Sequence, residues 1–133
     1  MSEGLVLQVP TSIGDLFDRL TILEIKAARI DEAQKIRNVS YELGMLRAIA
    51  SKLPPSSAEE RQLVAELKSA NGALWDIEEA IRGCELKQDF GADFVSLARA
   101  VYKTNDRCAE LKKQLNLLSD SEIIEEKSYK SQL

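Results

Sequence analysis

The sequence has no histidine, and glycine, proline, cysteine and aromatic residues are all scarce. Its 133 residues include six glycines, three prolines, two cysteines and 5% aromatic residues. Without histidine there is no Ser-His or Cys-His catalytic pair, no imidazole metal ligand and no side chain that ordinarily titrates near neutral pH. General acid–base chemistry would have to use carboxylates, lysines or tyrosines. Histidine-based catalysis is therefore excluded.

A basic overall charge and a long apolar run are also lacking. The formal net charge of -4 argues against a dedicated nucleic-acid binder, which neutralises phosphates with a basic face. No stretch reaches the about 18 consecutive apolar residues of a membrane span, and residues 1–10 lack the basic start of a signal peptide. We expect a soluble, cytoplasmic protein that binds neither nucleic acid nor membrane, with ordinary thiols at Cys84 and Cys108.

The apolar residues that are present recur at spacings of three and four, which is the period of a helix. Four such segments follow one another, and almost nothing has the pattern of a strand. Ser12 is expected to cap the first segment, a break near Asp31 to separate it from the second, and Pro54-Pro55 to end the second. Ser57 and Glu60 have the spacing of a capping box for the third, and the fourth begins at Gly91 or Ala92.

These segments predict an all-α fold, an antiparallel up-down helical bundle of about four long helices. We expect one domain over residues 1–133, with an extended N-terminal segment at 1–11 and a tail at 119–133 that is either a short helix or docked on the bundle. A long two-helix hairpin that dimerises into a four-helix bundle is the competing interpretation. It stays open because Ile22 and Ile25 lie outside the main apolar stripe of the first helix, so that this helix is either central or covered by a partner.

If the third and fourth helices form a hairpin that turns near residues 88–91, their facing residues can be deduced. The register brings Asn71 near Cys108 and separates Cys84 from Cys108 by about 20 Å along the axis, which disfavours a disulfide. It also predicts cross-helix proximity of Asp76 with Lys103 and of Glu79 with Arg99. Such pairs either set the register of the hairpin or belong to a small polar site.

The middle of this hairpin supplies most of the candidate ligand-binding residues, with Trp75 as an aromatic wall and the basic residues of the fourth helix as anion-binding groups. The full candidate set is Glu24, Trp75, Asp76, Glu79, Arg99, Tyr102, Lys103, Asn105, Asp106 and Arg107. Glu24 is included because it adjoins the apolar stripe of the first helix, so that its carboxylate points toward either the bundle interior or a dimer face. A basic residue of the fourth helix would satisfy it. The Asp76–Glu79 stretch resembles one acidic motif of helical nucleotide pyrophosphohydrolases, but its expected neighbours are basic and would repel Mg²⁺. We therefore predict no metal and no cofactor, and no catalytic residue is assigned.

Four stretches resemble a family of short bacterial all-α domains of unknown function. They are SIGDLFDRLTILEIK at 12–26, LWDIEEAIR at 74–82, LARAVYKTNDR at 97–107 and EEKSY at 125–129. The resemblance implies a bacterial or phage source, a self-contained helical domain and an association with tetratricopeptide or glycan-related proteins, but it supplies no activity. Cys108 stands where the family pattern leads us to expect arginine or another polar residue.

Two functions remain as expectations. The first is a non-enzymatic interaction or dimerisation module, a homodimer whose polar inter-helix cluster binds an anion or a protein partner. The alternative is a small-ligand protein or enzyme acting on a phosphorylated or nucleotide-sugar-like metabolite. In that case Arg99, Lys103 and Arg107 would hold the anion, and Asp76 or Glu79 would act as acid–base or metal-binding group.

Overall fold

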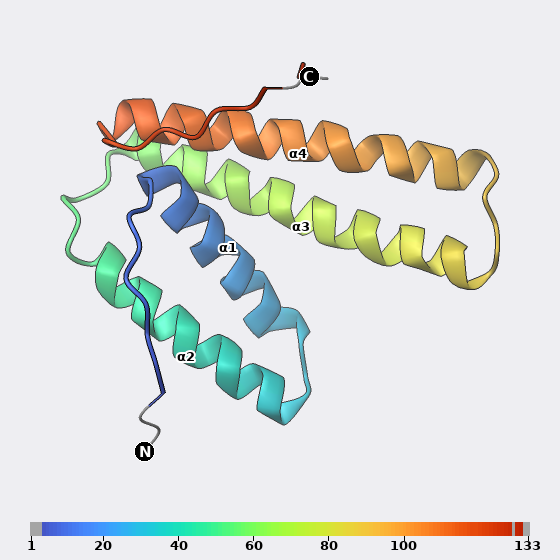
Figure 1. Cartoon of the computed structure of the whole chain (residues 1–133), viewed down its shortest axis with the longest axis horizontal. Coiled ribbons are helices and arrows are strands. Elements are labelled where there is room, and N and C mark those ends of the chain that lie inside the picture. Colours follow the sequence, from blue (N-terminus) through green and yellow to red (C-terminus); the bar gives the residue numbers. More distant parts are fainter. Residues whose placement is uncertain (1–3, 129, 132–133) are drawn as a thin grey trace.

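The computed structural model describes residues 4–128 and 130–131, and this part of the chain contains helices and no strand. The helices are α1 (Ile13–Arg29), α2 (Ala33–Ala50), α3 (Ala58–Leu86) and α4 (Ala92–Leu118). Neighbouring helices along the chain run antiparallel (Figure 1). The all-α helical bundle predicted from the sequence is confirmed. No helix in the described residues has the length and apolar character needed to cross a membrane.

The predicted helix starts are confirmed by their capping contacts. The Ser12 hydroxyl accepts the Asp15 N–H at 2.9 Å. At the start of α3 the Ser57 hydroxyl accepts the Glu60 N–H at 3.1 Å, and the Glu60 carboxylate accepts the Ser57 N–H at 3.2 Å. These contacts satisfy amide groups that have no partner inside a helix.

The ends of α3 and α4 use a feature that the sequence did not indicate. Gln88 follows α3 and Asp120 follows α4. Both have a φ of 56°, in the left-handed region that usually favours glycine. The Asp89 N–H then returns to the Cys84 carbonyl at 2.9 Å, and the Ser121 N–H to the Asn116 carbonyl at 2.8 Å. Both ends are Schellman motifs, which reverse the chain directly after the last helical turn.

The helices are arranged as a long hairpin with a shorter pair attached to one end of it (Figure 1). α3 and α4 form the hairpin, α1 contacts both of them and also α2, and α2 contacts α1 alone among the helices. The central position of α1 explains why Ile22 and Ile25 extend its apolar surface beyond one stripe. Within one chain Ile25 is buried, whereas Ile22 is only half-buried.

Two apolar clusters form the core at this end. One joins α1 to α2 through residues such as Leu20 and Leu43, and the other joins α3 to α4 through Leu67 and Leu111. Phe17 of α1 packs against both clusters and so connects them. We call the part of the molecule that contains α1, α2 and both clusters the base.

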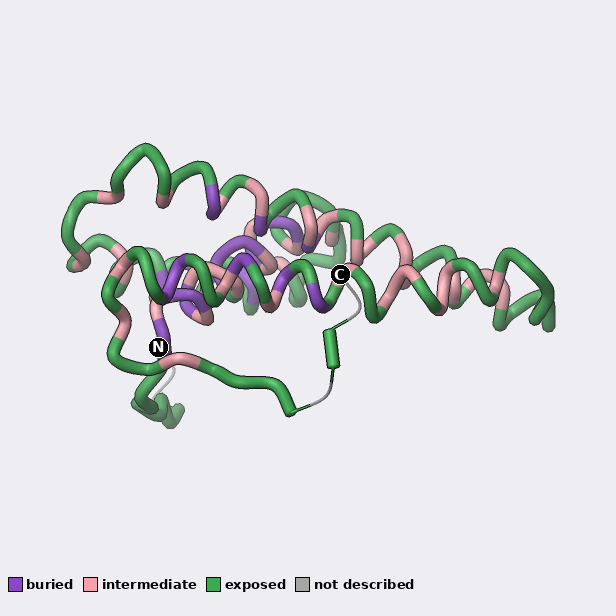
Figure 2. The backbone as a smooth tube through the Cα atoms, turned by 90° about the horizontal axis from the view of Figure 1, so that it is seen from above, coloured by how far each residue is buried: buried purple, intermediate pink, exposed green. Residues whose placement is uncertain are grey.

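The far half of the hairpin extends beyond the base. We call residues 72–105 the arm; it comprises the end of α3, the turn and the start of α4, and it contains no buried residue (Figure 2). Its inner stripe, which includes Leu74, Ile81, Leu97 and Val101, is only half-buried. Two helices packed on each other leave the edges of this stripe open, and a further layer would cover them.

The C-terminal segment is a docked tail and not a fifth helix. Residues 121–128 run back along α4 without helical structure (Figure 1). The Ser121 hydroxyl accepts the Ile13 N–H at 3.2 Å, and the Lys127 ammonium contacts the Asp106 carboxylate at 2.9 Å. Tyr129 lies outside the described residues.

Candidate functional site

The predicted site residues lie in several separate places on the molecule. Glu24 of α1 pairs with Arg47 of α2 and Lys68 of α3, each at 3.3 Å. The prediction that a basic residue of α4 would pair with Glu24 was wrong, because α2 and α3 supply the nearest cations. Glu24 therefore ties three helices together in the base.

Trp75, Asp76 and Glu79 lie where the arm leaves the base, on the side of α3 that faces α1. The Trp75 indole N–H donates to the Glu79 carboxylate at 2.9 Å. The Arg29 guanidinium pairs with Asp76 at 2.5 Å and lies 5.7 Å from the Trp75 ring centroid, a cation–π distance. The last turn of α1 is thus fastened to α3.

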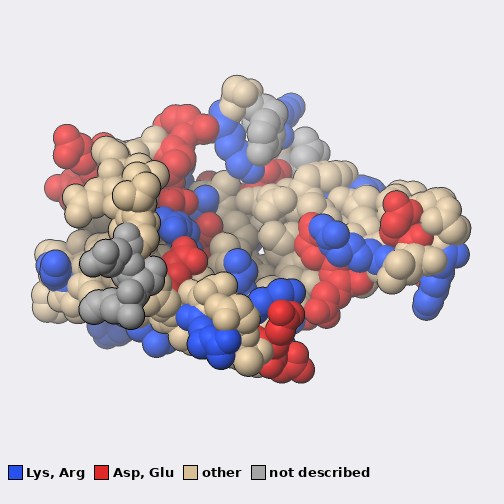
Figure 3. Space-filling model, turned by 60° about the horizontal axis from the view of Figure 1, so that its bottom comes forward, with Lys and Arg blue, Asp and Glu red and all other residues tan. Residues whose placement is uncertain are grey.

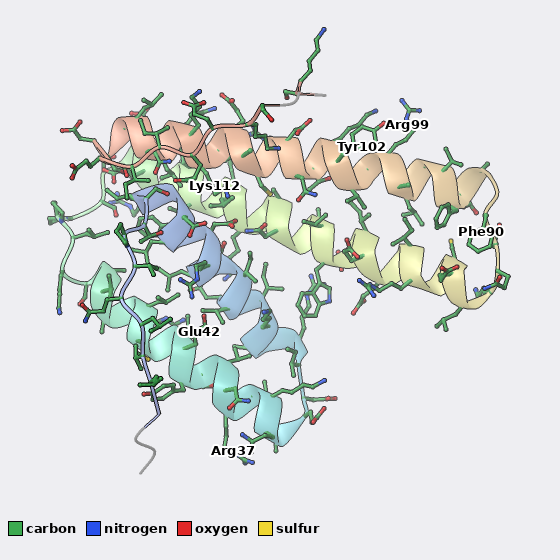
Figure 4. All side chains as sticks on the ribbon, viewed as in Figure 1. Arg37, Glu42, Phe90, Arg99, Tyr102 and Lys112 are labelled. Carbon is green, nitrogen blue, oxygen red and sulfur yellow. The ribbon has the colours of Figure 1, made fainter. Side chains whose placement is uncertain are left out.

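Arg99, Tyr102 and Lys103 lie on α4 in the arm and are exposed. In Figure 4 Arg99 and Tyr102 project from the side of α4 that faces away from α3. Neither Arg99 nor Lys103 forms an ion pair within the described part of the chain. The interpretation of Asp76–Lys103 and Glu79–Arg99 as ion pairs was wrong for the described residues: Asp76 pairs with Arg29, and Glu79 accepts the Trp75 indole N–H.

The last three candidates are divided among different partners. Asn105 is exposed, and Arg107 contacts Glu66 of α3 at 3.5 Å. Asp106 is 4% exposed, because the tail covers it and Lys127 pairs with it. The EEKSY stretch therefore does fold back on the hairpin at its described residues, as the sequence suggested for the tail.

A buried polar cluster lies where α1, α3 and α4 meet, and its partners in α1 were missed by the sequence reasoning. The predicted neighbours are close: the Cys108 thiol donates to the Asn71 side-chain oxygen at 3.4 Å. The Asn71 amide nitrogen donates to Asp18 at 2.9 Å and to the Thr21 hydroxyl at 3.1 Å. Polar residues inside the apolar run of α1 were the available signal.

This cluster is closed and internally satisfied. Every buried side-chain nitrogen and oxygen in the described residues has a hydrogen-bond partner. Burial, and secondarily the nearby Asp18 carboxylate, raises the pKa of the Cys108 thiol to about 11, so the thiolate that nucleophilic chemistry requires is disfavoured. The arrangement fits a structural junction of three helices.

The described residues also contain no group of three or more acidic or cysteine side chains placed to hold a metal ion. Asp76 and Glu79, the acidic pair considered for that role, are instead engaged by Arg29 and Trp75. The geometry offers no built metal centre in this part of the chain.

A predominantly apolar depression lies beside Trp75. We call it the notch: it has a volume of about 290 Å³ and is lined by Ile22 of α1 and by Asn71, Leu74, Trp75, Glu78, Glu79 and Arg82 of α3. Its wall combines apolar side chains with a charged rim, which is the composition of a docking site for an apolar side chain.

No family model matches this chain, and no match was found among curated proteins or solved structures. The resemblance to the bacterial all-α family therefore remains a prediction from the four sequence stretches.

Proposed function

We propose that this chain is a non-enzymatic interaction module that forms a homodimer through the arm. The observation that carries the proposal is the contrast between base and arm. The base encloses two apolar clusters, whereas the arm has an apolar inner stripe and no buried residue. A second arm would supply the missing layer and complete a four-helix arrangement.

Exposed apolar side chains near the tip of the arm support the same conclusion. Leu86 is 87% exposed, and Phe90 and Val95 are each 51% exposed. Phe90 and Phe94 form an edge-to-face pair with ring centroids 5.3 Å apart. These side chains add exposed apolar surface near the tip, which a partner could cover.

The scatter of the charged candidates favours this proposal over a small-ligand protein or enzyme. Such a protein would need anion-holding and acid–base groups around one bound molecule. Here Arg99 faces away from α3 and Lys103 is exposed. Asp76 is paired with Arg29, and Arg107 is paired with Glu66. We therefore give the arm, and not the charged candidates, the functional role.

Sedimentation velocity over a range of micromolar concentrations tests the proposal. We expect a concentration-dependent dimer for the unaltered chain and a weaker one, by at least about tenfold in Kd, for Leu86→Asp. Because Leu86 is exposed in the single chain, the substitution should leave helicity and the unfolding midpoint unchanged.

Leu117→Asp is the matched control, since Leu117 is 61% exposed on α4 and lies outside the arm. It should leave the dimer unaffected. A strict monomer at all concentrations, or equal weakening by both substitutions, would contradict dimerisation through the arm.

A further inference from the structure

We infer that the arms pair about a two-fold axis near position 80 of α3, through a row of four residues spaced four apart: Leu74, Glu78, Arg82 and Leu86. This inference rests on the proposed homodimer and specifies its interface. Each row would lie antiparallel to the same row of a second copy. Leu86 of each chain would then enter the notch of the other, and Glu78 of each would face Arg82 of the other.

The spacing defines a packing ridge. Residues four apart form an inclined row on a helix surface, and rows of this kind interdigitate in the commonest class of helix packing. From Leu74 to Leu86 the row spans about 18 Å at 1.5 Å per residue. It is therefore long enough for a contact at each end and a pair of contacts in the middle.

The order of residue types along the row is self-complementary only in the antiparallel sense. The row runs apolar, acidic, basic, apolar, so reversing one copy sets apolar against apolar and acid against base. A two-fold interface requires this property, because each contact occurs twice with the partners exchanged. A parallel pairing in register would instead oppose Glu78 to Glu78 and Arg82 to Arg82.

The charges needed for this pairing are available. Within one chain the Arg82 guanidinium contacts the Glu78 carboxylate at 3.3 Å, and their side chains are 79% and 43% exposed. The second copy would extend this pair into a ring of four alternating charges without requiring either residue to leave the helix surface. Networks of alternating charges specify register and partner orientation.

The notch and Leu86 fit as the two halves of an apolar anchor. Leu86 is the most exposed large apolar residue of the arm, and the notch is a predominantly apolar depression. They lie at opposite ends of the same row, which is where antiparallel pairing brings them together. A side chain seated in such a depression, with charged residues around it, is the usual form of an interface hot spot.

This surface also continues a face of α3 that is already used for helix packing. Nearer the base, α1 packs on α3 through Glu24–Lys68, Asp18–Asn71 and Arg29–Asp76 contacts. Farther along the arm, Glu78, Arg82 and Leu86 keep side chains that are 43%, 79% and 87% exposed. A helix from a second copy would take the place that α1 occupies nearer the base.

The charges where the arm leaves the base favour the approach of the tip of a second copy. The last turn of α1 carries Lys26 and Arg29, one and two turns beyond Ile22 of the notch. The tip of the arm carries Glu85, Asp89 and Asp93 together with Lys87, all exposed, so its net charge is negative. The inferred pairing brings the acidic tip of one copy toward the basic last turn of α1 in the other. Figure 3 shows acidic and basic side chains interspersed with uncharged surface along the arm.

Two charge reversals test the pairing. Arg82→Glu places two glutamates in the row, and Glu78→Arg places two arginines in it. Each variant alone should dimerise at least about tenfold more weakly than the unaltered chain, because every cross-chain charge contact becomes repulsive. An equimolar mixture should restore a dimer to within about threefold in Kd, because a heterodimer of the two opposes glutamates to arginines at all positions.

Trp75 provides a second readout. It is the only tryptophan in the chain and lines the notch, so its emission should shift to shorter wavelength as the dimer forms and Leu86 excludes water. The single variants should lose this concentration dependence and the mixture should regain it. Circular dichroism of each variant checks that the helices persist.

The outcomes separate the two proposals. An unaltered chain that dimerises, with no recovery in the mixture, would overturn the inferred row pairing and leave dimerisation through the arm in place. An unaltered chain that stays monomeric would overturn both. Recovery of the dimer without a change in Trp75 emission would contradict the seating of Leu86 in the notch.

Discussion

Gly14 sets how closely α1 approaches α4. Its N–H donates to the Asn116 side-chain oxygen at 2.6 Å, and a Cβ on this residue would lie 2.6 Å from the Lys112 carbonyl oxygen and 2.9 Å from that side-chain oxygen. The carbonyl belongs to helix backbone, which cannot yield locally. A methyl group here would have to push the two helices apart.

We therefore expect Gly14→Ala to lower the free energy of unfolding by about 1–3 kcal/mol, as overpacking of a tight contact does. Gly44→Ala is the control, because a Cβ on Gly44 of α2 meets nothing within 4 Å. That substitution should raise stability by about 0.5–1 kcal/mol, since alanine suits a helix interior better than glycine. Urea unfolding of both variants measures the difference, and equal effects would contradict the close approach.

At the scale of the element, the start of α3 depends on two reciprocal hydrogen bonds. Ser57→Ala removes the hydroxyl that accepts the Glu60 N–H, so we expect a loss of about 1 kcal/mol in urea unfolding. Ser56→Ala is the neighbouring control and should change stability by less than about 0.5 kcal/mol. A comparable loss in both variants would show that the cap is not responsible.

The same cap predicts a pH dependence. The backbone N–H of Ser57, and next the Ser119 hydroxyl, lower the pKa of Glu60 below its usual 4.5. A lowered native pKa stabilises the fold above the unfolded-state value, and that contribution is lost as pH falls through the native pKa. Glu60→Gln should therefore reduce the loss of stability on acidification, measured by unfolding at neutral pH and below pH 4; an unchanged slope would argue against this role.

The tail is fastened to α4 by two lysine contacts of unequal burial. Lys127 pairs with Asp106, whose side chain is 4% exposed, whereas Lys113 pairs with Glu126, whose side chain is 72% exposed. Lys127→Met should lower stability by about 1–3 kcal/mol and speed amide exchange in residues 121–128, because a buried carboxylate loses its cation. Lys113→Met should cost less than about 1 kcal/mol and leave tail exchange unchanged. Similar effects of the two substitutions would contradict a burial-dependent attachment.

At the scale of the whole molecule, the helix boundaries and the hairpin register could be predicted from local sequence patterns. The neighbours that each side chain meets could not. The caps at Ser12 and Ser57, and the nearness of Asn71 to Cys108, follow from short motifs and hairpin length. The outward direction of Arg99 and the pairing of Glu24 with α2 and α3 depend on how helices are rotated about their axes. The spacing of residues along a helix shows which of them share a face, but it does not show which neighbouring helix that face contacts.

The separation of base and arm leads to a prediction about the whole chain. All members of the two apolar clusters lie before residue 72 or after residue 105, so the arm contributes none of them. A shortened chain can join Asp76 of α3 to Lys103 of α4 through a short glycine-containing turn, because the register places these positions at similar heights on the hairpin. We expect this chain to unfold in a single transition with a smaller m-value, since less surface is exposed on unfolding.

The shortened chain should also be monomeric at concentrations where the unaltered chain dimerises, because it lacks Glu78, Arg82 and Leu86. Circular dichroism and urea unfolding test the integrity of the base, and sedimentation velocity tests the association. Loss of cooperative unfolding would show that the arm stabilises the base, whereas a persistent dimer would place the interface elsewhere. A folded monomer would show that the base is stable without the arm. The arm would then be needed for association and not for folding.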